Sequence, residues 1–162
     1  MFSRLKRFSP RSGDIPADRL RRLLNLWPPF LFTGIHITTI SDDFRDAEVE
    51  LRQRWYNRNY FGTHFGGSLF AMTDAMYAIQ LIHMLGPGYQ IWDQNASIEF
   101  VKPGRGVVTA RFHITDEALT TIREHTAGGQ KYLPRFSVDV TNADGEIVAR
   151  VMKTIYVRRK AP

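Results

Sequence analysis

One carboxylate, Asp74, stands in the middle of the most apolar segment of this 162-residue chain. From Phe65 to Leu85 apolar residues recur nearly all round a helical projection, which is typical of a helix enclosed by protein on most sides. Because an unpaired buried charge is costly, we expect Asp74 to lie at a protein–protein or protein–ligand boundary. A carboxylate there can act as a general base toward water or as a nucleophile.

A glycine-rich turn precedes this helix. Gly66 and Gly67 stand at the predicted helix start, where bare backbone N–H groups and the helix dipole can stabilise a developing oxyanion. Asp74 lies roughly 11 Å, or about two turns, further along the helix, too far to act on the same carbonyl within one chain. The turn itself reads Asn59-Tyr60-Phe61-Gly62-Thr63-His64-Phe65.

Composition and spacing argue against several other kinds of site. The chain has no cysteine, which excludes disulfides, thiolate zinc sites and a cysteine nucleophile. Its five histidines lack His-x-x-x-His and His-Glu-x-x-His spacing, so we expect no metal site. Ser68 lacks the Gly-x-Ser-x-Gly setting of a nucleophile, and we interpret it as a helix residue. No run of about 18 apolar residues is present, so we expect no transmembrane segment. The absence of cysteine fits a reducing compartment, and we expect a cytoplasmic location.

The net charge of +6 is concentrated at the N-terminus, where the first 22 residues hold seven Lys or Arg and two Asp. We interpret residues 1–15 as a basic arm and residues 16–160 as a single domain. A solvated tail is the simplest reading of the arm. Contact with phosphates or an anionic membrane, and the start of an organellar transit peptide, are the alternatives. Because the remainder is nearly neutral, we expect no nucleic-acid partner.

The elements that position the site residues are predicted from periodicity and turn residues. A first helix is expected after Ser12 or Asp14, with Pro16 near its first turn and Pro28-Pro29 at its end. A short helix is expected within residues 115–129, capped by Thr115. Alternating apolar and polar residues predict strands at 35–40, 47–54, 90–101, 106–114, 132–141 and 146–157.

These elements predict an α+β fold. A helix that is apolar on most faces can be covered only by a strongly curved sheet, so we expect an antiparallel sheet wrapped around one long central helix, with an additional N-terminal helix.

The segment from Asn59 to Asp74 resembles the signature of hotdog-fold acyl-CoA thioesterases, in particular the PaaI-like group and its branch described as domains of unknown function. The matching residues are Asn59, Gly62-Thr63, Gly66-Gly67 and Asp74. A softer match is Phe100-Val101-Lys102-Pro103-Gly104. The resemblance covers roughly Trp55 to Lys160 and implies the hotdog fold.

The resemblance also implies a homodimer in which Asp74 of one subunit faces the Gly66-Gly67 turn of the other, with a dimer of dimers (a homotetramer) as a further possibility. Asp74 is then the general base or nucleophile of a thioesterase, and Asn59 orients the water or the carboxylate. The implied substrate is an acyl-CoA or a related acyl thioester. No cofactor is implied beyond the coenzyme A of the substrate.

The chain departs from the family pattern at two places. Most relatives have a histidine directly before the paired glycines, whereas here Phe65 holds that position and we expect His64 to reach the site from the turn. Many relatives have a hydroxyl residue on the strand after the helix, whereas here Asp93 supplies a second acid. Two neighbouring carboxylates raise one pKa, which suits a proton-handling site or an inert hydrogen-bonded pair.

Further residues are candidates for substrate binding. The turn and helix contribute Gly62, Thr63, Phe65 and Phe70, and the later strands contribute Asp93 and Lys102. An acyl chain would lie against Phe70, Met72, Met76 and Tyr77, unless these are simple core residues. The phosphates of coenzyme A could meet cations that we otherwise interpret as scattered surface charges: Lys102, Arg105, Arg135, Lys153, Arg158, Arg159 and Lys160.

Two other functions remain open at this point. The first is a non-catalytic acyl- or acyl-CoA-binding protein, because the usual histidine and hydroxyl are missing. The second is a dehydratase of the same fold, because the turn around His64 resembles the His-Phe-Pro-Gly turn of acyl-carrier dehydratases.

Overall fold

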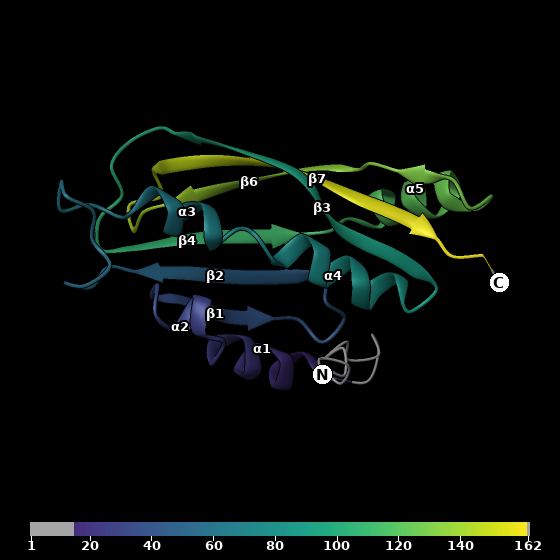
Figure 1. Cartoon of the computed structure of the whole chain (residues 1–162), viewed down its shortest axis with the longest axis horizontal. Coiled ribbons are helices and arrows are strands. Elements are labelled where there is room, and N and C mark those ends of the chain that lie inside the picture. Colours follow the sequence, from purple (N-terminus) through teal and green to yellow (C-terminus); the bar gives the residue numbers. More distant parts are fainter. Residues whose placement is uncertain (1–14, 162) are drawn as a thin grey trace, which may run out of the picture.

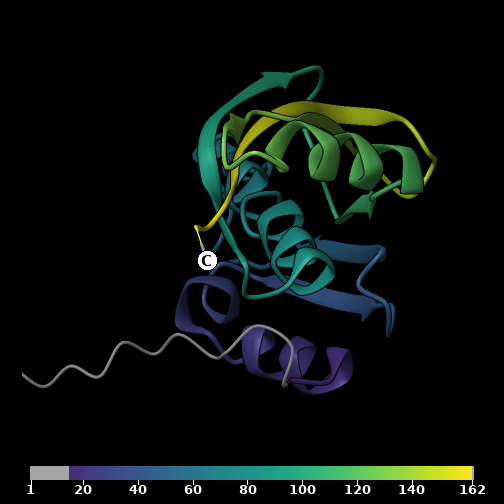
Figure 2. The same cartoon turned by 90° about the vertical axis from the view of Figure 1, so that its right-hand side faces the viewer.

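A single antiparallel sheet of seven strands curves around the central helical segment of the chain (Figures 1 and 2). The computed structural model describes residues 15–161. The strands are β1 (Ile35–Ile40), β2 (Asp46–Arg52), β3 (Tyr89–Phe100), β4 (Val107–His113), β5 (Lys131–Tyr132), β6 (Arg135–Thr141) and β7 (Ile147–Arg159). Their order is β1-β2-β4-β6-β7-β3, and β5 also pairs with β7. This arrangement confirms the predicted hotdog fold.

The strands form because apolar residues alternate with polar ones. In β2, Ala47, Val49 and Leu51 are buried, while Glu48 and Glu50 are partly exposed. One predicted strand, 132–141, is divided into β5 and β6. Pro134 lies between them and has no N–H to donate to a neighbouring strand, although its carbonyl accepts from Ile155.

The central segment contains two helices placed nearly end to end, α3 (Gly66–Ala71) and α4 (Met76–Leu85). The predicted central helix is therefore present, with a local break over residues 72–75. Its inner face fills the core with Met72, Met76 and Leu81, which are fully buried. Tyr77 is also buried, and its hydroxyl donates to the Ser137 carbonyl at 2.8 Å. Met72, Met76 and Tyr77 are therefore core residues in this chain.

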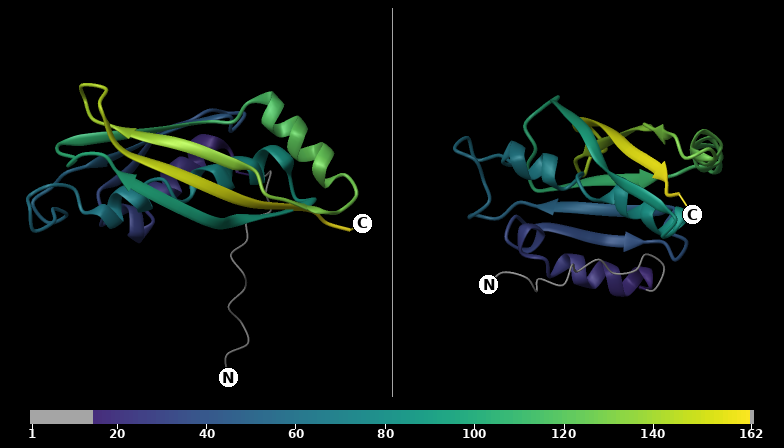
Figure 3. Two further views of the ribbon diagram at one scale, coloured as in Figure 1. Left: turned by 90° about the horizontal axis from the view of Figure 1, so that it is seen from above. Right: turned by 45° about the vertical axis from the view of Figure 1, so that its right-hand side comes forward.

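The remaining helices are α1 (Ala17–Asn25), α2 (Pro28–Leu31) and α5 (Asp116–Thr126). In Figure 3, α1 lies along β1 at one edge of the sheet, and the Asn25 side chain bonds both the N–H and the carbonyl of Ile37. Pro28-Pro29 begins α2, whereas we expected it only to end the first helix. Thr115 caps α5 as predicted, accepting from the N–H of Ala118.

Two further predictions concern the basic N-terminal arm and the absence of a transmembrane segment. Ser12, Asp14 and most of the predicted basic arm lie outside the described residues. Within residues 15–161, no helix combines the length and hydrophobicity needed to span a bilayer.

Candidate functional site

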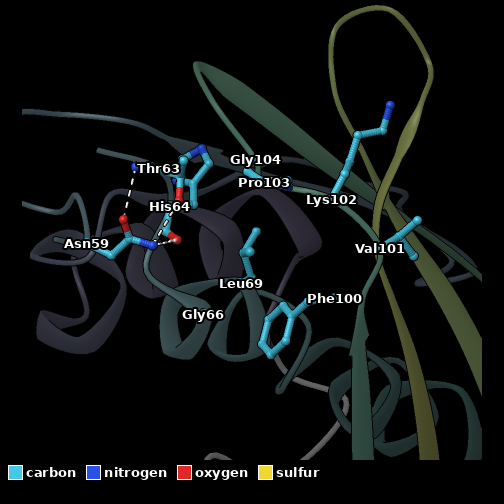
Figure 4. A pocket seen from close by; sticks show the side chains of 10 residues that line it. All are labelled: Asn59, Thr63, His64, Gly66, Leu69, Phe100, Val101, Lys102, Pro103 and Gly104. Atoms are coloured by element: carbon cyan, nitrogen blue, oxygen red, sulfur yellow. Dashed lines mark hydrogen bonds between the residues drawn. The ribbon is translucent and has the colours of Figure 1, made fainter. Parts of the chain in front are cut away.

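Asn59 organises the turn that leads into α3 (Figure 4). Its Oδ1 accepts from the N–H groups of Phe61 (2.9 Å) and Thr63 (3.0 Å). Its Nδ2 donates to Thr63 Oγ1 (2.8 Å) and to the His64 carbonyl (3.0 Å). These four bonds use the full capacity of the amide. The predicted role of Asn59 in orienting a water or a carboxylate would therefore require one of these bonds to be exchanged.

The imidazole of His64 lies behind this turn and is only 3% exposed. Its Nε2 is 3.1 Å from the Gly106 carbonyl. Because a carbonyl can only accept, we assign the proton to Nε2, and Nδ1 is left as an acceptor without a partner among the described residues. Burial lowers the pKa of His64, and the bond to Gly106 only opposes this effect. The ring is therefore neutral near pH 7.

Gly66 and Gly67 begin α3, as predicted. Their N–H groups have no intrahelical acceptor because they occupy the first turn, whereas Ser68 and Leu69 both donate to the Phe65 carbonyl. Two phenyl rings lie against the glycine backbone. A Cβ added to Gly67 would overlap Cε1 of the Phe65 ring, and one added to Gly66 would lie 3.0 Å from Cζ of Phe100.

An open pocket of about 380 Å³ adjoins the turn. Figure 4 shows Asn59, Thr63 and His64 on one side of it, with Leu69 and Phe100 on another. The remaining lining residues are Gly66, Val101, Lys102, Pro103 and Gly104. The pocket therefore combines a polar wall with apolar side chains, as ligand sites commonly do.

Lys102 is the cation of this pocket. Its Nζ lies 2.6 Å from Oε1 of Glu146, which stands at the start of the final hairpin strand. Hydrogen bonds from Lys102 and from Asn142 lower the pKa of Glu146. A phosphate that binds Lys102 would therefore compete with an existing ion pair.

Asp74 lies at the break between α3 and α4. The N–H groups of Thr73 and Asp74 donate to carbonyls three residues back, at Phe70 (3.1 Å) and Ala71 (3.2 Å). The Thr73 hydroxyl also donates to the Phe70 carbonyl at 2.8 Å. These are the tighter bonds of a 3₁₀ turn, which in mid-helix often marks a functional position. The side chain of Asp74 is 63% exposed in the single chain.

A buried lysine faces Asp74. Lys153 of β7 has a fully buried side chain, and its Nζ donates to Asp74 Oδ1 at 2.9 Å. The same Nζ lies 3.1 Å from Oδ1 of Asp93, within ion-pair distance but without hydrogen-bond alignment. It also lies 5.8 Å from the centre of the Phe70 ring. One ammonium thus lies within ion-pair distance of two carboxylates, which come from different elements.

Burial raises the pKa of Asp93 above its ordinary value. The Lys153 ammonium opposes the rise, and the Asp74 carboxylate adds to it. The prediction that a second acid lies near Asp74 therefore holds in the structure, although burial contributes more to the raised pKa than the neighbouring carboxylate does. Within residues 15–161, no three His, Cys, Asp or Glu side chains gather where they could hold a metal ion.

The sequence model of the family described as Domain of unknown function (DUF4442) matches residues 18–157. The chain belongs to this family. Among curated proteins, no sequence matches it significantly.

Solved structures share the fold of this DUF4442 protein. A Pseudomonas aeruginosa protein of unknown function, described as a probable thioesterase, aligns with a TM-score of 0.81 and 14% identity, over 92% of this chain and 99% of that one. The thioesterase HI1161 from Haemophilus influenzae gives 0.66 and 14%, over 91% and 94%. A Chlorobaculum tepidum protein of unknown function gives 0.70 and 15%, over 90% and 98%.

The predicted site residues of the DUF4442 protein fall into two groups. The first surrounds the turn and the pocket, and its members are Asn59, Gly62, Thr63, His64, Phe65, Gly66, Gly67 and Lys102. The second surrounds Lys153, and its members are Phe70, Asp74 and Asp93. Asp74, Asp93 and Phe70 do not line the pocket. Within one chain, the two groups therefore do not share this pocket.

Sequence reasoning missed the position of Lys153, which we expected on the surface. The signal was present in β7, where Val151, Lys153, Ile155 and Val157 occupy alternate positions and all point inward. A lysine in register with three buried apolar residues indicates a buried cation, and it predicts acidic partners.

Proposed function

We propose that this protein hydrolyses acyl thioesters, with acyl-CoA as the substrate class, and that it does so as a homodimer. The observation that supports this most directly is the Asp74 carboxylate, which lies exposed at the break between α3 and α4 with one oxygen held by a buried ammonium. An oriented, accessible carboxylate is what a general base or nucleophile requires. The fold shared with proteins described as thioesterases adds support.

In the proposed reaction, Asp74 of one subunit takes a proton from a water molecule, whose oxygen attacks the thioester carbon. The developing oxyanion accepts hydrogen bonds from the N–H groups at Gly66 and Gly67 of the partner subunit. Collapse of the tetrahedral intermediate breaks the C–S bond, and the thiolate takes up a proton. The products are a carboxylic acid and a free thiol. If Asp74 instead attacks the carbon directly, the C–S bond breaks, the thiolate leaves and takes up a proton, and a mixed anhydride remains. Water then hydrolyses this anhydride to the carboxylic acid and the free Asp74 carboxylate.

Thiol release from short, long and aromatic acyl-CoAs tests the proposal. Asp74→Asn should lower kcat/KM by about a hundredfold or more, as expected for loss of a general base. Asp144→Asn, in an exposed hairpin turn, is the matched control and should behave as wild type. Absence of turnover on every thioester would overturn the proposed function. Equal turnover by wild type and Asp74→Asn would overturn the role of Asp74.

A mixing experiment tests the shared site. If each site needs Asp74 from one subunit and the glycine turn from the other, an equimolar mixture of Asp74→Asn and Gly66→Val chains, refolded together, should regain about a quarter of wild-type activity. No recovery, despite a dimeric mass by light scattering, would place both groups of each site in one chain.

A non-catalytic acyl-CoA-binding protein is the second candidate. It is favoured by one observation, namely that the amide of Asn59 is fully used in the turn and is not free for chemistry. Calorimetric binding of acyl-CoA without any turnover would support this candidate.

A further inference from the structure

Lys153 is the buried charge that the proposed reaction does not yet use. Its side chain is fully buried, although an ammonium taken out of water without partners is strongly disfavoured. Such a burial persists only where counter-charges and hydrogen bonds compensate it. Here the compensation comes from Asp74 at 2.9 Å and Asp93 at 3.1 Å. The three groups come from three elements: β7, the α3–α4 break and β3.

The lysine is the fixed member of this cluster. Strand β7 lies between β6 and β3, so its backbone is paired on both sides, and Lys153 is opposite Phe136 and Ala96. Val151 and Ile155, which flank it on the inner face, are fully buried. Asp74, in contrast, is 63% exposed and stands at a break in the helix. Lys153 therefore constrains Asp74, rather than the reverse.

The two carboxylates are held differently. Asp74 Oδ1 accepts an aligned hydrogen bond from Lys153, whereas Asp93 Oδ1 has no hydrogen-bond partner. Asp93 lies beside an irregularity in the pairing of β3 with β7, between Asp93 and Asn95. Bulges of this kind redirect side chains near functional sites. Asp93 thus supplies negative charge near the buried ammonium, while the aligned hydrogen bond of that ammonium goes to Asp74.

We propose that Lys153 is a positioning residue for thioester hydrolysis, which binds Asp74 Oδ1, fixes the orientation of the carboxylate and leaves Oδ2 to accept the proton of the attacking water. The inference rests on the proposed function. Within residues 15–161 the protein gives Oδ2 of Asp74 no hydrogen bond, so this oxygen is available. The charged groups that face Asp74 are Lys153 from β7 and, across the ammonium, Asp93 from β3.

Three variants test this role: Lys153→Met, Asp93→Asn and the double variant. Lys153→Met removes the hydrogen bond that orients the Asp74 carboxylate. Its kcat should fall by about tenfold or more with little change in KM, because a misplaced catalytic group costs rate rather than binding. Asp93→Asn keeps the bond from Lys153 to Asp74, so its kcat should fall by less. A residue with a purely structural role would lower kcat only through loss of folded protein, which the free energy of unfolding of each variant reports.

The double variant also serves as the control for misfolding. If Lys153→Met fails to fold because Asp93 loses its counter-ion, the double variant removes both charges and keeps the volume of both side chains. Its kcat should still lie below that of wild type, because the aligned bond to Asp74 is gone. A folded variant without Lys153 whose kcat equals that of wild type would overturn the inference.

A second measurement separates this inference from the proposed function. Carbon NMR of the Asp74 carboxyl group, recorded in wild type and in the variants at one pH, reports the surroundings of the carboxylate without any reaction. If wild type hydrolyses no thioester, the proposed function is overturned, and with it the reaction in which Lys153 would act. The NMR signal then still decides whether Lys153 holds the Asp74 carboxylate, and an unchanged signal in Lys153→Met overturns that part as well.

Discussion

The phenyl ring of Phe100 lies against the backbone of Gly66, so that a side chain on this glycine would meet the ring at 3.0 Å. Phe100 comes from the end of β3 and is 55% exposed, and it lines the pocket together with Gly66. A side chain on the neighbouring Gly67 would meet the ring of Phe65, which does not line the pocket. The two glycines therefore differ in what a substitution would disturb.

We expect Gly66→Ala to displace the Phe100 ring and to impair substrate use more than folding. Alanine is favoured over glycine in a helix by about 1 kcal/mol, which offsets the cost of moving an exposed ring. The free energy of unfolding should thus stay within about 1 kcal/mol of wild type, while KM for acyl-CoA rises. Gly67→Ala is the matched control, with similar stability and a smaller change in KM. Equal effects of both variants on KM would contradict the assignment of the pocket.

We expect Asn59→Ala to destabilise the protein by about 2 kcal/mol or more, because four hydrogen bonds of a partly buried turn lose their partner. Urea unfolding measures the effect. Asn95→Ala, at an exposed position of β3, should change stability little. If Asn59→Ala unfolds at the same urea concentration as wild type, the turn does not depend on this side chain.

Stability should decrease on mild acidification. Burial lowers the pKa of His36, His64 and His83 in the folded protein. Histidines of the unfolded chain take up protons near their ordinary pKa of about 6.5, so protons bind the unfolded state first as the pH falls. The free energy of unfolding should be highest above about pH 7 and decrease from about pH 6.5 downward.

The contribution of His64 can be isolated with His64→Gln, whose amide can still donate to the Gly106 carbonyl. This variant should show a shallower loss of stability between pH 7 and pH 5 in urea titrations. His125→Gln, at an exposed position of α5, is the control. A slope as steep as that of wild type in His64→Gln would show that His64 does not contribute to the acid sensitivity.

The ion pair between Lys102 and Glu146 gives two variants with opposite expected effects. Lys102→Ala should raise KM for acyl-CoA several-fold with little change in kcat, if this cation meets the phosphates. Glu146→Gln frees Lys102 from its partner at 2.6 Å and should lower the same KM. Thioesters of N-acetylcysteamine, which carry no phosphate, should show neither effect. Equal shifts with both substrates would argue against phosphate binding by Lys102.

Much of the architecture follows from local sequence patterns. The alternation in β2 and β7 and the cap at Thr115 are short-range signals, and the elements that they predicted are present. Pro28-Pro29 was ambiguous, because proline both ends one helix and suits the first turn of the next. The break at residues 72–75 has only a weak local signal, since Thr and Asp have low helix propensity but still occur inside regular helices.

The candidate site was only partly predictable, because some of its contacts join residues that are distant in sequence. Asn59, the glycines and Asp74 are close in sequence, and their spacing was informative. The partners of Asp74 are Lys153, which is 79 residues away, and across the ammonium Asp93, so the site depends on how β3 and β7 pair. Pairing between distant strands is a property of the whole fold. The pattern in β7 placed a lysine among inward positions but did not say which carboxylates it would meet.

The pairing of β3 with β7 also determines when during synthesis the sheet can be completed. Its strand partner is β7, which begins at Ile147, after β4, α5, β5 and β6. As the chain leaves the ribosome, β3 and the helix before it emerge well before that partner. A nascent chain that ends before β7 keeps the edge of β3 open and leaves Asp74 and Asp93 without their cation. The charged cluster can therefore form only after β7 has been synthesised, and a chain that stops before β7 is expected to have an exposed strand edge that is prone to aggregate.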